Sequence, residues 1–116
     1  MKIKLVSFGY KYGSPTNANY LWDVRFLPNP YWVDELRPKT GCDHEVSEYV
    51  IGSAEGRSFI KQLKPLLLYL VQQNRVAEKD ELVLAVGCTG GRHRSVAVTE
   101  VLYDLLKMVS ADLEME

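Results

Sequence analysis

The residues best suited to chemistry lie in one short stretch, Val-Gly-Cys-Thr-Gly-Gly-Arg-His-Arg-Ser over residues 86–95. An apolar run precedes this stretch and a helical pattern follows it. A strand, a tight glycine-rich loop and a helix N-terminus gather backbone N–H groups around one point, with the positive end of the helix dipole behind them. Arg92, His93 and Arg94 add charge and directed donors. The stretch therefore predicts an anion-binding loop, and phosphate is the expected ligand.

Every residue of this loop is a candidate ligand contact: Cys88, Thr89, Gly90, Gly91, Arg92, His93, Arg94 and Ser95. The loop is not a Walker A motif, because Arg92 and His93 stand where that motif requires its second glycine and its lysine. Thr89 and Ser95 carry hydroxyl groups that could bind the anion or cap the following helix. The sequence leaves both roles open.

Cys88 also fits a catalytic template, since five residues separate it from Arg94 and Ser95 follows. Cysteine-dependent phosphatases use this spacing, with a thiolate that attacks phosphorus. Gly87 stands where those enzymes usually have histidine, and Asp23 is only a candidate for the general acid. We therefore expect Cys88 to be a half-buried, unreactive residue of the loop, and we keep the phosphatase as an alternative.

Asp23 and Arg25 lie two residues apart on an expected strand and so share a face. They form either an ion pair at the end of the sheet or part of the site, with Asp23 on a ligand hydroxyl or amine and Arg25 on the phosphate. The aromatic side chains Trp22, Tyr31 and Trp32 are expected to anchor the core or a loop rather than to stack on a ligand. No His/Cys cluster has metal-ligand spacing, so no metal is expected.

Apolar periodicity places these residues on a small α/β fold. Strands are expected over residues 2–8, 20–26 and 82–86, helices over 44–50, 55–73 and 92–108, and a final edge strand within 110–116. Pro65 should kink or divide its helix. The alternation predicts a mostly parallel sheet of three to four strands flanked by helices. Ligands collect at the carboxyl ends of such strands, which brings residues 9–13, 23–29 and 88–95 to one edge.

Length and composition fit one domain over residues 1–116. The net charge of −1 does not suggest a general nucleic-acid binder, but residues 1–40 carry six basic side chains against three acidic ones, so a local basic face is expected. Cys42 and Cys88, in a sequence with no signal peptide, suggest reduced thiols and a cytoplasmic location. No apolar run approaches 18 residues, so no membrane association is expected.

Five separated motifs resemble the C-terminal domain of the bacterial RapZ family, whose members are RNase adaptors also described as nucleotide-binding proteins. The motifs follow the family order and cover nearly the whole chain: Ser7–Gly13, Asp23–Pro30, Leu36–Pro38, Thr40–Gly41 and Gly87–Val96. The resemblance implies a domain with an anion pocket that binds small RNAs, presents RNA to an endoribonuclease and, in enteric bacteria, senses glucosamine 6-phosphate. It points to Asp23, Arg25, Thr89, Gly90, Gly91, His93 and Arg94 as the pocket.

The chain also departs from the family pattern. In the family an N-terminal P-loop domain precedes this one, and its absence here suggests a stand-alone domain to which nucleotide hydrolysis cannot be assigned. Tyr31 stands where the enteric relatives have a pocket histidine, which leaves the specificity for a sugar phosphate open. The basic tail that often ends the family's chains is also missing, so RNA binding loses phosphate contacts.

The leading hypothesis is a non-enzymatic regulatory domain that binds a phosphosugar or a nucleotide such as ATP at residues 88–95. No separate cofactor is expected. Small RNA, an RNase and a second copy of the chain are the candidate macromolecular partners. Two alternatives stay open: a small cysteine-dependent phosphatase, and an oligomeric interaction module with a vestigial pocket.

Overall fold

The computed structural model describes all 116 residues and has an α/β fold built on a four-stranded, all-parallel sheet. The strands, in the order β2-β3-β1-β4, are β1 (Lys2–Gly9), β2 (Tyr20–Asp23), β3 (Glu81–Cys88) and β4 (Leu113–Met115). The helices are α1 (His44–Val50), α2 (Ala54–Val76) and α3 (Arg94–Leu106), with short 3-10 turns η1 (Tyr10–Tyr12) and η2 (Pro30–Trp32). The expected parallel α/β architecture is confirmed.

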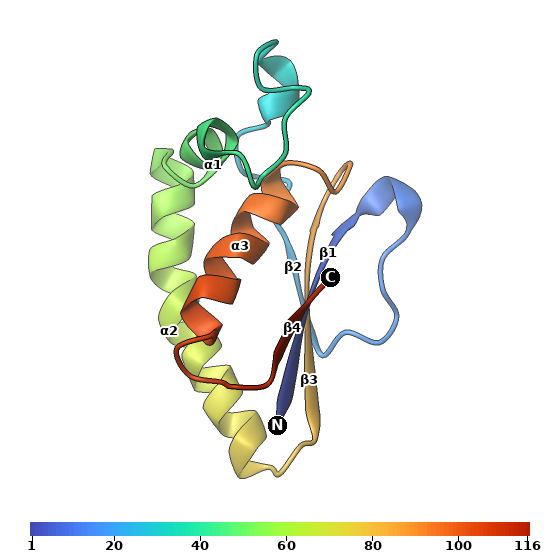
Figure 1. Ribbon diagram of the computed structural model, residues 1–116, viewed down its shortest axis with the longest axis vertical. Coiled ribbons are helices and arrows are strands. Elements are labelled where there is room, and N and C mark those ends of the chain that lie inside the picture. The colour runs from blue at the N-terminus through green and yellow to red at the C-terminus, as the bar shows by residue number, and fades with distance from the viewer.

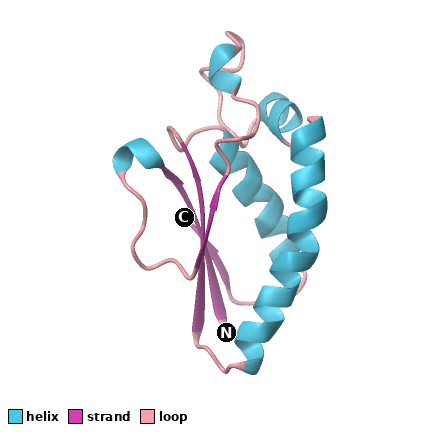
Figure 2. Ribbon diagram, turned by 180° about the vertical axis from the view of Figure 1, so that it is seen from behind, coloured by secondary structure: helices cyan, strands magenta, loops and turns pink.

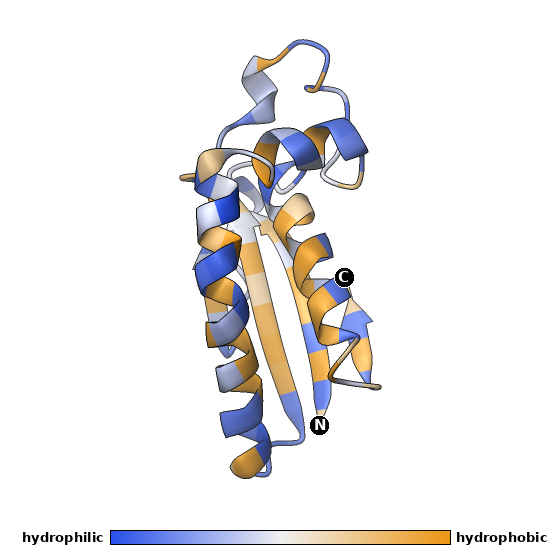
Figure 3. Cartoon of the chain, turned by 90° about the vertical axis from the view of Figure 1, so that its left-hand side faces the viewer, coloured by the Kyte–Doolittle hydropathy of each residue, from blue (hydrophilic) through white to orange (hydrophobic).

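The helices α2 and α3 cover one face of the sheet, and the segment between η1 and β2 runs along the other (Figures 1 and 2). The inner strand β3 is buried from Leu82 to Cys88, as its continuous apolar run requires. Its neighbour β1 alternates, with Ile3 and Leu5 fully buried in a core of 18 residues. Figure 3 shows the apolar residues of the strands behind the two helices. The sheet is therefore a rigid base for the loops at its ends.

Helix α2 packs one apolar stripe on the sheet, through Ile60, Leu63, Leu67 and Val71. It begins at Ser53, whose hydroxyl accepts a hydrogen bond of 2.9 Å from the N–H of Gly56. Pro65 lies inside the helix, which is nevertheless one continuous element. The prediction that Pro65 could divide the helix is therefore wrong. Pro65 is on the exposed side, where water can satisfy the carbonyl group that a proline leaves unbonded.

Two expected elements are shorter in the structure. The strand predicted over 20–26 ends at Asp23, because its partner β3 ends at Cys88 and leaves the next residues nothing to pair with. The helix predicted over 92–108 begins at Arg94 and ends at Leu106. The weak alternation of the C-terminal tail does form an edge strand, β4, which pairs with β1.

The carboxyl ends of three strands meet at one edge of the sheet, as expected. Gly9 pairs with Cys88 and Asp23 pairs with Gly87 in the register of the ladders. A bond of 3.1 Å from the N–H of Lys11 to the carbonyl of Thr89 then links the loops that follow β1 and β3. None of the helices is long and apolar enough to cross a membrane.

Candidate functional site

An open pocket of about 1160 Å³ lies at this edge. One wall is the loop between β3 and α3, residues 89–93, called here the glycine loop. A second wall is the segment over residues 25–40, called the overhang, which stands above the start of α3 in Figure 1. Lys11 and Tyr12 of η1 also line the pocket. All the predicted loop residues from Cys88 to Arg94 line it, whereas Ser95 is fully buried beneath.

The glycine loop is held against β1 by a close backbone contact. Gly91 has φ +71°, in the left-handed region that favours glycine. A Cβ atom at Gly91 would lie 2.6 Å from the N atom of Gly9. The neighbouring Gly90 differs, because a Cβ atom there would meet nothing within 4 Å. Gly91 therefore fixes the path of the loop, while Gly90 leaves open space at its exposed turn.

The start of α3 has no acidic partner for its positive end. His93 is the N-cap residue without a capping side-chain bond, and the first turn contains no acidic residue. No backbone N–H of residues 89–94 donates to a backbone carbonyl of the chain. The N–H of Gly91 hydrogen-bonds the Cys88 sulfur instead, so the N–H groups of the other residues in this range are available to an outside acceptor. Neither Thr89 nor Ser95 caps the helix.

All three basic residues at this helix start are bound to the overhang, Arg92 and His93 through carbonyls of residues 37–39. Arg92 donates from Nη2 to the carbonyl of Pro38 and from Nε to that of Lys39, the latter at 2.9 Å. The Nε2 atom of His93 lies 3.0 Å from the carbonyl of Arg37. Because a carbonyl can only accept, Nε2 must carry the proton in this contact. Side chains predicted as anion contacts thus also fasten one pocket wall to the other.

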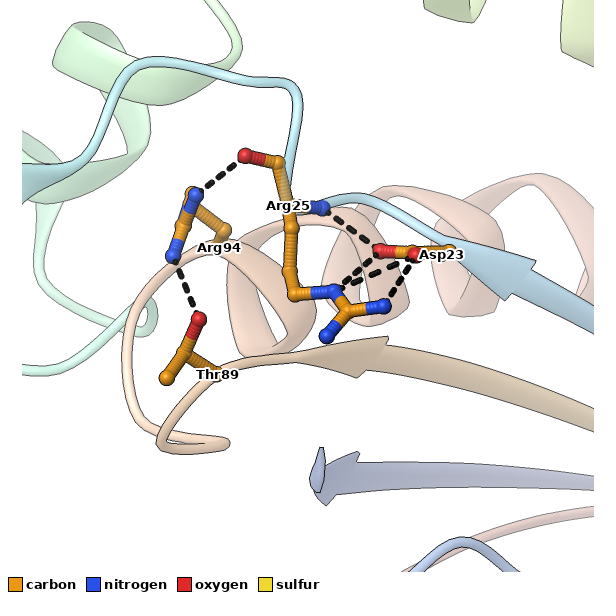
Figure 4. Close-up of polar contacts among 4 residues, drawn as sticks. All are labelled: Asp23, Arg25, Thr89 and Arg94. Carbon is orange, nitrogen blue, oxygen red and sulfur yellow. Dashed lines mark hydrogen bonds and ion pairs between the residues drawn. The ribbon is translucent and has the colours of Figure 1, made fainter. Parts of the chain in front are cut away.

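Arg94 is the most deeply placed of the three, with 6% of its surface exposed. Its Nη1 atom donates to the carbonyls of Arg25 and Leu27, and Nη2 lies 3.4 Å from the hydroxyl oxygen of Thr89. Figure 4 shows the guanidinium bridging the overhang and the glycine loop. A buried cation needs such bonds because burial removes it from water.

Asp23 and Arg25 form an ion pair with each other and do not line the pocket. Nη2 of Arg25 lies 2.7 Å from Oδ2 of Asp23 (Figure 4). The guanidinium carbon of Arg25 lies 3.9 Å from the ring centroid of Tyr10. Hydrogen bonds from the Arg25 side chain hold the pKa of the Asp23 carboxyl below its ordinary value. The structure thus contains the ion pair that the sequence left as one of two options.

Cys88 is 2% exposed, more buried than the half-buried residue expected, and its thiol contacts the start of α3. The N–H of Ser95 donates to Sγ at 3.3 Å, and Sγ lies 3.2 Å from Oγ of the same serine. Burial alone would raise the pKa of the thiol. Hydrogen bonds from Ser95 and Gly91 and the charge of Arg94 outweigh it, so the pKa lies below its ordinary value. The thiol is therefore electrostatically activated but covered.

Two aromatic side chains that we expected to anchor the core or a loop are exposed pocket residues instead. Trp32 is 74% exposed and Tyr31 is 49% exposed, whereas Trp22 packs against the core. The guanidinium of Arg37 lies 4.8 Å from the Tyr31 ring centroid. The sequence did contain a signal for this exposure: Tyr31 and Trp32 directly follow two prolines in a polar loop without apolar periodicity. Sequence reasoning also missed Lys11, Tyr12 and Arg37.

The pocket is electropositive. Its lining holds four Lys or Arg side chains and one acidic side chain, Asp34, which pairs with Arg37 at 3.1 Å: the cations are Lys11, Arg37, Arg92 and Arg94. The chain contains no group of three or more His, Cys, Asp or Glu side chains that could hold a metal ion. The arrangement suits a small anion that carries further groups for the aromatic wall.

Comparison with known proteins identifies the relatives of this fold and site. The family model of the RapZ C-terminal domain matches residues 1–116 of the sequence. A nucleotide-binding protein of Caldanaerobacter subterraneus is 52% identical over 105 residues, which are 90% of this chain and 37% of that protein. Nucleotide-binding proteins of Brevibacillus brevis and Bacillus licheniformis are each 48% identical, over 88% and 90% of this chain and 35% and 36% of their own lengths. The chain thus spans little more than a third of these relatives.

The two neighbouring glycines of the loop offer a matched test of its geometry. Gly91→Ala should lower the free energy of unfolding by about 1–3 kcal/mol, since its backbone is left-handed and its Cβ atom would meet Gly9. Gly90→Ala should change it by less than about 0.5 kcal/mol. Urea denaturation followed by circular dichroism measures both. Equal effects of the two substitutions would contradict this account of the loop.

The two free cysteines test whether burial or activation governs Cys88. Burial predicts that iodoacetamide labels the exposed Cys42 first and Cys88 only after denaturant is added. If the fraction of thiolate governs the reaction instead, Cys88 is labelled before Cys42. The hydrogen bond to Glu100 and burial raise the pKa of the Cys42 thiol, whereas the pKa of the Cys88 thiol is lowered. Mass spectrometry after labelling at pH 8 distinguishes them, with Cys42→Ser as the control. Rapid labelling of native Cys88 would reopen the phosphatase alternative.

Proposed function

This chain belongs to the RapZ C-terminal domain family, and from that premise we propose that it binds the phosphate group of a small molecule, a phosphosugar or a nucleotide, at the glycine loop. Its relatives are named nucleotide-binding proteins, which supports the nucleotide class.

The observation that carries the proposal is the uncompensated positive charge at the start of α3. A helix N-terminus favours negative charge, yet the first turn here has no acidic residue and three consecutive basic residues stand at its start. The carboxylate of Asp23 is already bound by Arg25. An incoming phosphate would therefore meet free N–H groups and cations with no acidic side chain in the first turn as a competitor.

The burial of Cys88 favours binding over hydrolysis. A phosphatase of this type requires the sulfur to reach the phosphorus atom, and Sγ is covered here and contacted by Ser95. Asp23, the only candidate acid that we identified, lies outside the pocket in its ion pair. The same loop thus holds the parts of an anion site and lacks the accessible parts of a catalytic one.

We further propose that occupancy is regulatory, because the ligand and the overhang compete for the same donors. Arg92 and His93 donate to carbonyls of Arg37, Pro38 and Lys39. A phosphate bound to the glycine loop is a stronger acceptor than a carbonyl and would draw at least Arg92 away. Loosening the overhang would change the surface offered to a partner, for which family membership suggests RNA or an RNase.

Gly90 allows the binding proposal to be tested by charge alone. Gly90→Asp should weaken inorganic phosphate binding at least about tenfold, because it adds a negative charge to an exposed pocket residue that has room for a side chain. The nearly isosteric Gly90→Asn should bind within about threefold of the original chain. NMR titration of the amides of residues 89–95 gives both dissociation constants. The proposal is wrong if phosphate shifts none of these amides, or if Asp and Asn have the same effect.

The regulatory step predicts a change in amide hydrogen exchange within the overhang. The N–H of Gly41 donates to the carbonyl of Arg92 at 3.0 Å, so this amide reports on the tether. Saturating phosphate should accelerate exchange at Lys39 and Gly41 several-fold, while amides of α2 stay unchanged. In Arg92→Ala these two amides should exchange rapidly with or without phosphate. Unchanged exchange in a chain whose loop amides do respond to phosphate would reject the competition.

A further inference from the structure

We infer that the phosphorylated ligand is a mononucleotide whose base stacks on the exposed aromatic wall formed by Tyr31 and Trp32. This inference rests on the proposed phosphate site and adds the second half of the ligand to it. The aromatic wall and the glycine loop line the same pocket. A ligand that carries a phosphate at one end and a flat aromatic ring at the other fits both walls.

The exposure of the aromatic wall is the first observation behind this inference. Trp32, with 74% of its surface exposed, is among the most exposed large apolar side chains of the chain. Tyr31 and Trp32 pack edge to face, with ring centroids 5.1 Å apart and planes at 88°. Their packing on each other leaves much of both rings open to the pocket side or to solvent. Large exposed aromatic surface marks a contact site for another molecule.

The second observation is that this wall is held in place without a ligand. Oδ1 of Asn29 accepts a hydrogen bond of 3.1 Å from the N–H of Tyr31, which starts η2. The Nε atom of Arg37 donates to the carbonyl of Tyr31 at 2.7 Å while its guanidinium covers part of the Tyr31 ring. His93 fastens the carbonyl of Arg37 in turn. Stacking on this wall therefore requires little ordering of the protein.

The chemistry of the two walls selects a nucleotide over a phosphosugar. A sugar phosphate satisfies the glycine loop but offers no π face to Trp32, whereas every nucleobase does. The charge distribution selects a single nucleotide over a strand. A nucleic-acid strand needs cations repeated along its backbone, but the cations here surround one pocket in a chain whose net charge is −1.

The decisive comparison is between AMP and ribose 5-phosphate, which share the phosphate and the sugar and differ only in the base. Isothermal titration calorimetry on the full chain should show AMP binding roughly 5- to 150-fold more tightly than ribose 5-phosphate. Trp32→Ala should abolish this preference and leave the dissociation constant of ribose 5-phosphate unchanged. Trp32→Phe retains an aromatic face and should keep most of the preference. The exposure of Trp32 makes both variants compatible with folding.

Tryptophan fluorescence gives a second readout. In a Trp22→Phe background the only tryptophan is Trp32, and AMP should quench it while ribose 5-phosphate should not. Equal affinities for the two ligands, with ribose 5-phosphate still bound, would reject the base site and leave the phosphate site standing. Binding of neither ligand would reject both proposals. An eight-nucleotide RNA that binds more than about tenfold tighter than AMP, in a Trp32-dependent manner, would replace the mononucleotide with a strand.

Discussion

The buried guanidinium of Arg94 is the interaction on which the rest of the site depends. It is the first residue of α3, where the helix dipole disfavours a cation, and it has no carboxylate partner. Its burial is tolerated because carbonyls of Arg25 and Leu27 and the hydroxyl of Thr89 surround it. One side chain thereby joins the end of β2, the overhang and the glycine loop into a single framework.

This framework explains why a segment with almost no regular structure can form a pocket wall. Between β2 and α1 the overhang has only the short turn η2, and it stands away from the sheet (Figure 1). Its backbone carbonyls are instead satisfied by the Arg92, His93 and Arg94 side chains. The aromatic wall is therefore positioned by the same loop that would hold a phosphate, so the two halves of the site are mechanically connected.

The same connection imposes a conflict on the basic residues. Anion binding and the tethering of the overhang draw on one set of side-chain donors, whereas no N–H group of the glycine loop donates to a backbone carbonyl of the chain. A site in which the backbone binds the anion and the side chains respond to it can convert occupancy into movement of the overhang. Cys88 lines the same pocket but is only 2% exposed, because its thiol contacts Ser95 at the start of α3.

Much of the fold and half of the site followed from the sequence alone, because local patterns carry that information. Apolar periodicity located α2 and β3, and the glycine-rich Cys-x5-Arg segment marked the loop at the end of β3. The parallel arrangement then placed three strand ends together. These conclusions depend on neighbouring residues and on the general behaviour of parallel sheets.

Only the tertiary structure decided what the polar and aromatic side chains contact. The partners of Arg94 lie 67 and 69 residues away in sequence, and no local rule assigns a guanidinium to a distant carbonyl. Asp23 satisfies Arg25 two residues on instead of a ligand, because β2 ends there and the chain turns. Trp32 is 74% exposed, whereas Leu27 and Leu36 of the same segment are buried in the core. Burial and pairing depend on which segments meet in space, and this the sequence pattern does not encode.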